Sequence, residues 1–222
     1  MHKSQPNLLT AAVVQVGTGR GFVVGAADDQ RYIITAAHCL PRSRYPIPHL
    51  ANGGQELTLP RFIGPLGSKR SKHSIWGELC VLSLTDDIAV FAMPDNQALG
   101  DEADEYEEFT ATAMLVGDAP PLVPPYEWKT VPGAPAWMLS LDLQWLPCMV
   151  HSNGRFLVTS GAKIEGGMSG SPILDANGAA IGLISTSGDD ASHFDDCHPR
   201  LAGCLPPWLS MRIPTAGMRH DV

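Results

Sequence analysis

Three stretches of the chain carry side chains that together could perform nucleophilic catalysis. "GGMSGSPIL" holds Ser169 among glycines, "YIITAAHCL" leads a β-branched run into His38, and "DDIAVF" begins with Asp86 and Asp87. A serine hydroxyl is a poor nucleophile at neutral pH unless an adjacent imidazole accepts its proton. That imidazole works best when a buried carboxylate fixes its tautomer and stabilises the imidazolium. His38, Asp87 and Ser169 therefore form a candidate triad for acyl transfer.

The glycines around Ser169 suit the fourth element of such a site, an oxyanion hole. Backbone N–H groups must converge on one point that no side chain fills. Gly167 can adopt the conformation that turns its N–H inward beside that of Ser169, and Gly170 lets the chain leave the turn without crowding a substrate. Taken alone, the stretch could equally be a plain Gly/Ser loop, and His38 alone could be a core histidine bonded to a backbone carbonyl.

The elements that must position these residues are predicted to be short β-strands. Apolar runs bounded by Gly, Pro, Asp or Asn recur along the chain: "LLTAAVVQVG", "GFVVGAA", "RYIITAA", "IAVFAM", "AWMLSLDL", "PCMVHS", "RFLVTS", "SPILD" and "AAIGLISTS". "ADDQR" (27–31) and "DANG" (175–178) indicate turns, the second with the Asn-Gly pair favoured in tight hairpins. No long helix is expected in the body of the chain. The best helical candidate is "PPWLSMR" (206–212), with prolines in its first turn.

The composition fits a globular chain of 222 residues, with 44% hydrophobic and 17% charged residues. The chain has 22 glycines and 19 prolines, and such frequent turn-forming residues are typical of folds built from many short strands. In the middle, "DEADEYEE" (101–108) is a block of like charge and is expected to be a solvated loop. A proline-rich connector over 116–135 follows it. Two β-barrels are therefore expected, over 1–112 with His38 and Asp87 and over 113–222 with Ser169, and the active site in the cleft between them.

Charge and cysteine content narrow the class of protein. A net charge of −8 without a Lys/Arg cluster argues against a nucleic-acid partner, because phosphate binding relies on clustered basic residues. No apolar run reaches transmembrane length, and Leu8–Val14 is too short for a convincing signal peptide. The five cysteines are odd in number and scattered, which favours reduced thiols in a cytoplasm. Cys197 and Cys204 are close enough in sequence to pair if the chain were exported.

"TAAHC", "DIAV" and "GMSGSP" resemble the three signature blocks of the chymotrypsin-like (trypsin-fold) serine peptidases, in the order of that family. The resemblance covers about residues 11 to 190. It implies an all-β fold of two six-stranded antiparallel barrels, here with a short C-terminal helix, and a His38, Asp87 and Ser169 triad. It also implies an oxyanion hole from the N–H groups of Gly167 and Ser169, with no cofactor and no metal. The family places its acid directly before Ile-Ala-Val, which favours Asp87 over Asp86.

Within the family, "GTGRGFVV" and "GMSGSPILDANGAAIGLIS" are similar to the unprocessed bacterial branch, which includes the HtrA-type peptidases. Digestive members of the family pair a freshly cut N-terminus with an aspartate directly before the catalytic serine. Met168 stands at that position here, so we expect competence without N-terminal trimming. Cys39 stands where the family often has a disulfide, but the upstream strand offers no partner cysteine.

The resemblance also implies where a peptide would bind. The base of the primary specificity pocket should come from "KIE", including Lys163 and Ile164, and its wall from Ser185, Thr186 and Ser187. An inward Lys163 would favour an acidic substrate side chain, but burying an unpaired ammonium is costly, so an apolar pocket lined by Ile164 is favoured. The wall would pair with an extended peptide through backbone hydrogen bonds.

Two further features favour structural interpretations. "HFDDCHPR" (193–200) has metal-ligand residue types but lacks a second ligand cluster, so a polar loop is favoured over a zinc site. Four tryptophans are expected to pack in the core or at an interface: Trp128, Trp137, Trp145 and Trp208.

The main functional hypothesis is an endopeptidase acting on proteins or peptides. Its alternatives are a regulatory peptide-binding protein and an effector peptidase that is silent until a protein partner orders the Gly166–Gly167 turn.

Overall fold

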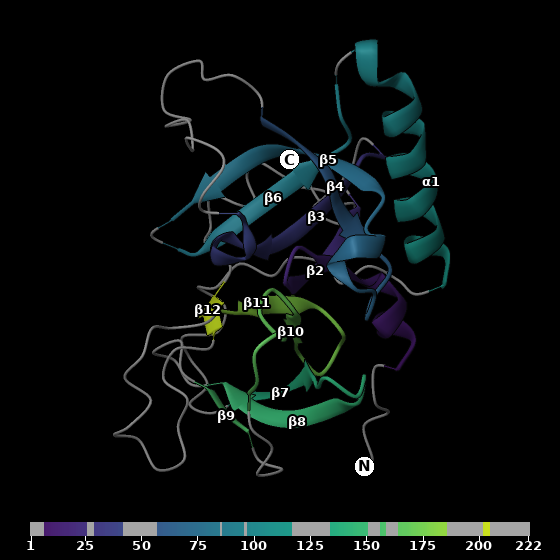
Figure 1. The fold of residues 1–222 in the computed structure, drawn as a ribbon. Helices are drawn as coiled ribbons and strands as arrows, with labels where there is room; N and C mark the ends of the chain where they lie inside the picture. The colour runs from purple at the N-terminus through teal and green to yellow at the C-terminus, as the bar shows by residue number, and fades with distance from the viewer. Residues whose placement is uncertain are drawn as a thin grey trace, which may run out of the picture.

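The computed structural model describes residues 7–25, 29–41, 57–84, 86–95, 97–116, 134–150, 156–158, 164–185 and 202–204. Its strands form two groups, one before and one after helix α1 (Gly100–Val116), as Figure 1 shows. The first group is β1 (Val13–Val16), β2 (Gly19–Gly25), β3 (Arg31–Ala36), β4 (Leu57–Gly64), β5 (Ile75–Ser83) and β6 (Ile88–Ala92). The second group is β7 (Ala134–Leu139), β8 (Trp145–Val150), β9 (Phe156–Val158), β10 (Pro172–Leu174), β11 (Ala180–Ile184) and β12 (Ala202–Cys204).

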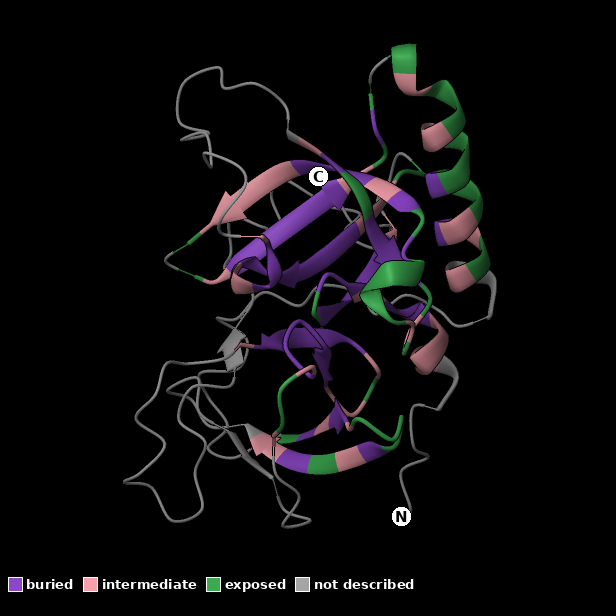
Figure 2. Ribbon diagram, in the orientation of Figure 1, coloured by how far each residue is buried: buried purple, intermediate pink, exposed green. Residues whose placement is uncertain are grey.

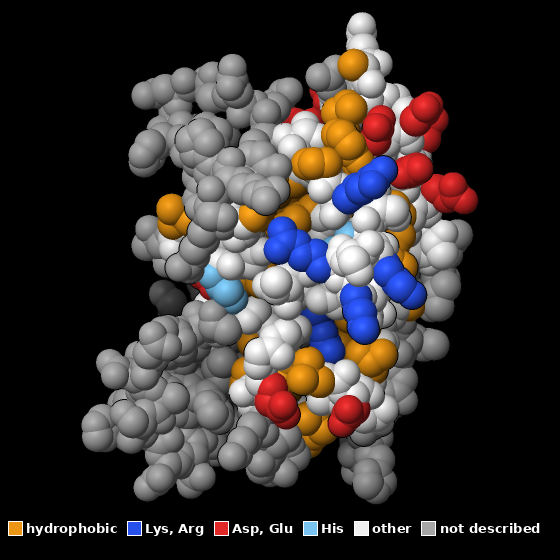
Figure 3. All heavy atoms as spheres, in the orientation of Figure 1, with side chains coloured by type: hydrophobic (Ala, Val, Ile, Leu, Met, Phe, Trp, Pro, Cys, Tyr) orange, Lys and Arg blue, Asp and Glu red, His pale blue; other side chains and the backbone are white. Residues whose placement is uncertain are grey.

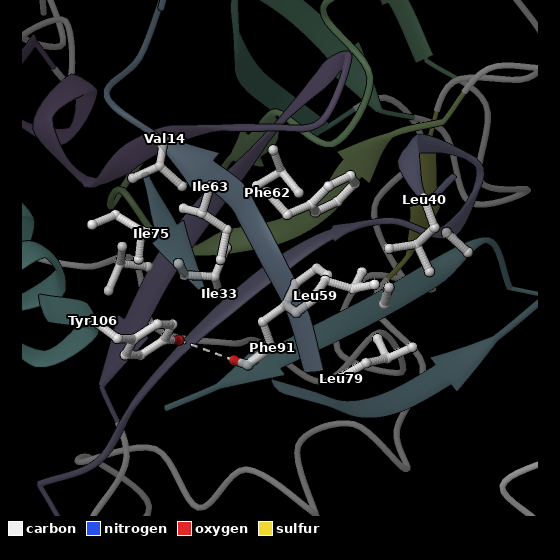
Figure 4. Close-up of a cluster of buried hydrophobic side chains, with 14 residues drawn as sticks. Val14, Ile33, Leu40, Leu59, Phe62, Ile63, Ile75, Leu79, Phe91 and Tyr106 are labelled. Carbon is white, nitrogen blue, oxygen red and sulfur yellow. Dashed lines mark hydrogen bonds between the residues drawn. The ribbon is translucent and has the colours of Figure 1, made fainter. Parts of the chain in front are cut away.

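The first group closes into an antiparallel barrel in the order β1-β2-β3-β6-β5-β4. Pairing of Val16 with Ile63 joins β1 to β4 and completes the ring, so the barrel has no open edge. Its interior is filled by apolar side chains from all six strands, among them Val14, Ile33, Ile63 and Phe91 (Figure 4). The expected N-terminal six-stranded barrel is thus confirmed.

The second group forms a six-stranded antiparallel sheet in the order β12-β11-β10-β7-β8-β9. Among the described residues no pairing joins β9 to β12, so the structure shows a second six-stranded sheet and does not confirm the expected second closed barrel. The hairpin expected at "DANG" connects β10 to β11. Asp175 Oδ1 accepts the N–H groups of Asn177 and Ala179 there, and Gly178 has a φ of +83°.

The block of acids over 101–108 is not a loop, and that expectation was wrong. It lies in α1, a helix in the body of the chain, where none was expected. Acidic residues in its first turn stabilise the helix, because they interact with the positive end of its dipole. Most of its acidic side chains face solvent (Figures 2 and 3). Tyr106 and Thr110 lie on its opposite face and are buried against the barrel. The Tyr106 hydroxyl donates to the carbonyl oxygens of Phe91 and Arg31.

Other elements also differ from expectation. The first run begins as the 3-10 helix η1 (Asn7–Ala12), and its strand starts only at Val13. Strands β4 and β5 were not expected from the sequence. Pro60 and the bulge between Leu59 and Ile63 interrupt the pattern of β4, and Arg61 there has a φ of +48°. The expected boundary after residue 112 falls inside α1. The candidate helix over 206–212 lies outside the described residues.

The two groups of strands share a core. One cluster of buried side chains includes Phe22 and Ile34 from the barrel and Leu139, Trp145 and Leu183 from the sheet. The Trp145 indole N–H also donates to Thr10 Oγ1 of η1 at 2.9 Å. Packing of this kind resists motion of the barrel relative to the second sheet, so residues on their facing surfaces keep fixed relative positions. None of the described helices has the length and apolar content needed to cross a membrane.

Candidate active site

His38 and Asp87 are brought together by the pairing of β3 with β6. Ala36 pairs with Ile88, so the residues just beyond these strand ends become neighbours. His38 lies in the short 3-10 helix η2 (Ala37–Cys39), and Asp87 lies directly before β6. The φ of Asp87 is +55°, a left-handed value that aspartate tolerates better than most residues. This backbone lets the Asp87 carbonyl accept the Ala37 N–H while its carboxylate faces His38.

The Asp87 carboxylate accepts three hydrogen bonds. Its Oδ2 accepts the ring Nδ1–H of His38 at 2.7 Å, and its Oδ1 accepts the backbone N–H of His38 at 2.9 Å. The third donor is the hydroxyl of Ser185, directly after β11, which also reaches Oδ2. The carboxylate therefore fixes the imidazole with Nδ1 protonated and Nε2 as the acceptor. The carboxylate of Asp86 instead accepts the hydroxyl of Ser83 at 2.7 Å.

These contacts shift the pKa of both groups. The hydrogen bond with Asp87, followed by the contact with Cys39, raises the pKa of His38 from 6.5 to about 9, against the opposing effect of burial. Burial alone would raise the pKa of Asp87, but the hydrogen bonds from His38 and Ser185 prevail and lower it. The two side chains are 18% and 22% exposed, so a substrate can still reach the imidazole.

Ser169 lies against the barrel, in the turn before β10. Its carbonyl oxygen accepts the backbone N–H of Arg20 at 2.7 Å. The thiol of Cys39 lies 3.8 Å from that carbonyl oxygen and 3.9 Å from Nε2 of His38. The Cys39 side chain thus contacts both the imidazole of His38 and the backbone of Ser169. Both Ser169 and His38 are described, and no hydrogen bond joins the hydroxyl to Nε2. Catalytic hydrogen bonds are often long or absent before substrate binds, so the lack of this bond does not exclude Ser169 as the nucleophile.

The turn before Ser169 leaves two backbone donors available. The N–H groups of Met168, Gly170 and Ser171 donate to the carbonyl oxygens of Glu165, Ile184 and Met168. By contrast, the N–H groups of Gly167 and Ser169 donate to no described residue. Gly167 has a φ of +96°, a value that favours glycine. These two amides, two positions apart in the sequence and without an acceptor among the described residues, are the donors that the expected oxyanion hole would use.

Gly170 and Met168 hold this turn in place. A Cβ on Gly170, whose φ is +82°, would overlap the carbonyl oxygen of Arg20, so only glycine permits the close approach of the turn to β2. Met168 is 1% exposed and packs with Ile173 and Ile181. Its sulfur accepts the N–H of Glu165 at 3.3 Å. The turn is thus anchored by a buried thioether in the core of the second sheet.

The expected substrate pocket is only partly described. Ile164 is half-buried and packs against the apolar cluster around Met168. Ser185 is described, and its side chain contacts Asp87, a role that the sequence did not indicate. Several other expected residues lie outside the described residues: Lys163, Thr186, Ser187, the 193–200 segment and Cys197.

Three described cysteines, Cys39, Cys80 and Cys148, are free thiols. Burial raises the pKa of Cys80 to about 11 and that of Cys148 to about 12.

The chain was also compared with known proteins. The family model of the trypsin-like peptidase domain matches residues 17–183, well over half of the chain. A solved structure similar to this chain is the Rv3671c protease in its inactive form, at 16% sequence identity and a TM-score of 0.48, with 94% of this chain and 93% of that chain covered. No curated protein matches the sequence.

Proposed function

Since the chain belongs to the family of trypsin-like peptidase domains, we propose that it is a serine endopeptidase that uses Ser169, His38 and Asp87. Family membership makes it a serine peptidase and makes proteins or peptides its substrates. The observation that best supports the residue assignment is the set of three hydrogen bonds on the Asp87 carboxylate. Two of them come from His38, and together they leave Nε2 of the imidazole free to act as a base.

In the proposed mechanism, Ser169 Oγ attacks the substrate carbonyl carbon and its proton moves to Nε2 of His38. The carbonyl oxygen becomes an oxyanion, which accepts the N–H groups of Gly167 and Ser169. The tetrahedral adduct collapses when His38 returns the proton to the leaving amine, and the C–N bond breaks. The product is an acyl-enzyme on Ser169. Water then attacks it, with His38 again taking the proton and returning it to Oγ.

The same proposal covers the substrate-binding residues and activation. Ile164 would line an apolar specificity pocket, with Lys163 beside it, and the Ser185–Ser187 segment would pair with an extended peptide. No cofactor is needed for these steps. Because Met168 anchors the turn through core packing, the enzyme would be competent without N-terminal trimming.

A turnover assay separates catalysis from the alternatives. We expect the protein, incubated with a mixture of denatured proteins, to generate new N-termini in proportion to time and enzyme concentration. A regulatory peptide-binding protein would retain peptides without new termini. An effector peptidase would generate termini only after addition of lysate from cells that express its partner. Absence of new termini in both conditions would contradict the proposal.

The activity should rise with pH into the alkaline range. His38 must be neutral to accept the serine proton, and its pKa is raised to about 9 by the hydrogen bond with Asp87. Below that pH, kcat/KM should fall about tenfold per pH unit and should level off above it, because kcat/KM reports the free enzyme. A pH profile with a chromogenic peptide measures this limb. A limb near 6.5, the ordinary value for histidine, would show that Asp87 does not stabilise the imidazolium in solution.

A further inference from the structure

Arg20 is a buried cation at the boundary between the barrel and the second sheet. It lies on β2, which runs along the side of the barrel nearest β10 and β11 (Figure 1). The residue is 3% exposed, which is unusual for arginine. Burial lowers the pKa of its guanidinium. Among the described residues no carboxylate lies within ion-pair distance of Arg20, so its charge is stabilised by other means.

Main-chain carbonyl groups replace the missing carboxylate. One terminal nitrogen of the guanidinium donates to the carbonyl oxygens of Ser140 at 2.9 Å and Leu139 at 3.2 Å. The other donates to the carbonyl oxygen of Leu141 at 3.3 Å. The planar fork of arginine suits such divergent acceptors, whereas lysine offers a single nitrogen. The side chain thus crosses from the barrel and fixes the turn that follows β7.

The backbone of Arg20 fixes the turn that carries Ser169. Its N–H donates to the Ser169 carbonyl oxygen at 2.7 Å, and its own carbonyl oxygen packs against Gly170 while accepting the Thr35 hydroxyl at 2.6 Å. The segment bound by the guanidinium and the turn bound by the backbone of Arg20 also contact each other. A Cβ built on Gly167 would lie 3.6 Å from the Leu141 side chain, so the segment held by the guanidinium packs beside Gly167.

We propose that Arg20 is a positioning residue that aligns Ser169 and the Gly167 amide with the His38 imidazole, an inference that rests on the proposed function. The candidate triad is divided between the two groups of strands, with His38 and Asp87 on the barrel and Ser169 on the turn before β10. Proton transfer and oxyanion binding demand placement to within a fraction of an ångström. Arg20 contacts both groups directly and is buried where they meet, so it sets their relative position.

The test compares Arg20→Met, Arg20→Lys and Arg31→Met with the unaltered protein. Methionine keeps an unbranched apolar side chain and the backbone N–H but removes every guanidinium bond, and lysine keeps the charge without the fork. Arg31 is the matched control, because it lies on the same barrel and pairs with Glu107 of α1 at 3.9 Å. For each protein, peptide hydrolysis and the rate of fluorophosphonate labelling are measured per folded molecule, together with Tm.

We expect Arg20→Met to lower kcat by about tenfold to a hundredfold with KM changed less than about twofold, because misplacement affects the transition state more than substrate binding. Labelling should slow in parallel. Arg20→Lys should lose about fivefold or more while remaining folded, and Arg31→Met should match the unaltered protein.

A lower Tm with unchanged kcat in the Arg20 variants would show a merely structural role and would overturn the inference. So would an Arg20→Lys protein with full kcat, even if Arg20→Met failed to fold. Failure of the proposed function looks different, since the unaltered protein itself would then neither label nor hydrolyse peptides.

Discussion

Replacing Ser169 by alanine should abolish covalent labelling by a fluorophosphonate probe and lower kcat by about 10⁴- to 10⁶-fold. The probe reacts only with a hydroxyl whose proton an adjacent base accepts, and the alanine side chain has no oxygen. The fold should tolerate the change, because the Ser169 hydroxyl makes no hydrogen bond with His38 or any other described residue and alanine is smaller. Intact-mass measurement after labelling and kcat for a peptide substrate give the two readouts.

The matched control for that experiment is Ser74→Ala, which alters an exposed serine of the same chain. We expect its labelling and kcat to equal those of the unaltered protein. Retained labelling in a folded Ser169→Ala protein would remove Ser169 from the role of nucleophile. Loss of labelling in both variants would instead indicate an effect on folding, which circular dichroism detects.

Replacing Asp87 by asparagine should lower kcat by about 10⁴-fold without unfolding the protein. Asparagine tolerates the left-handed φ of +55° at this position, whereas alanine would add backbone strain. A measurement of kcat beside the circular dichroism spectrum and Tm therefore reports the loss of the carboxylate rather than the loss of the turn.

The environment of Asp87 dictates how an asparagine would be oriented. Oδ1 faces the backbone N–H of His38, which can only donate, so the amide oxygen must take that place. The amide nitrogen then takes the place of Oδ2 and donates to Nδ1 of His38 and to the Ser185 hydroxyl. A histidine that accepts at Nδ1 carries its proton on Nε2, the atom that must receive the serine proton. The variant would hold the imidazole in the unproductive tautomer.

Asp86→Asn is the control for the acid. Asp86 is exposed and bonds to Ser83, so this variant should keep kcat within about twofold of the unaltered protein. In the Asp87→Asn variant the residual kcat/KM should rise at a lower pH than in the unaltered protein, because the raised pKa of His38 depends first on Asp87. A large loss in Asp86→Asn with full activity in Asp87→Asn would reverse the assignment of the two acids.

Helix α1 shows where local patterns misled the prediction. Its acids suggested a solvated loop because like charges in sequence repel. The helix instead spreads them over its solvent face, and its stability comes from Tyr106 packed on the barrel. Such packing is a tertiary effect, since neither Tyr106 nor its partner carbonyls at Arg31 and Phe91 carry a local signal. Strand β4 was missed for a different reason: its bulge between Leu59 and Ile63 interrupts the alternation of apolar and polar residues that would have identified a strand.

By itself, the sequence determined the residue types available for chemistry, their order along the chain and the glycines that permit a left-handed turn at 167 and 170. These features are local, because nucleophilicity, basicity and backbone freedom belong to single residues. Only the tertiary structure decided that Ser185 bonds Asp87 and that Arg20 binds carbonyl groups of residues 139–141. Those contacts join distant segments, and main-chain acceptors are the same at every residue. Their partners therefore leave no trace in the sequence and emerge only when strand pairing and core packing bring the segments together.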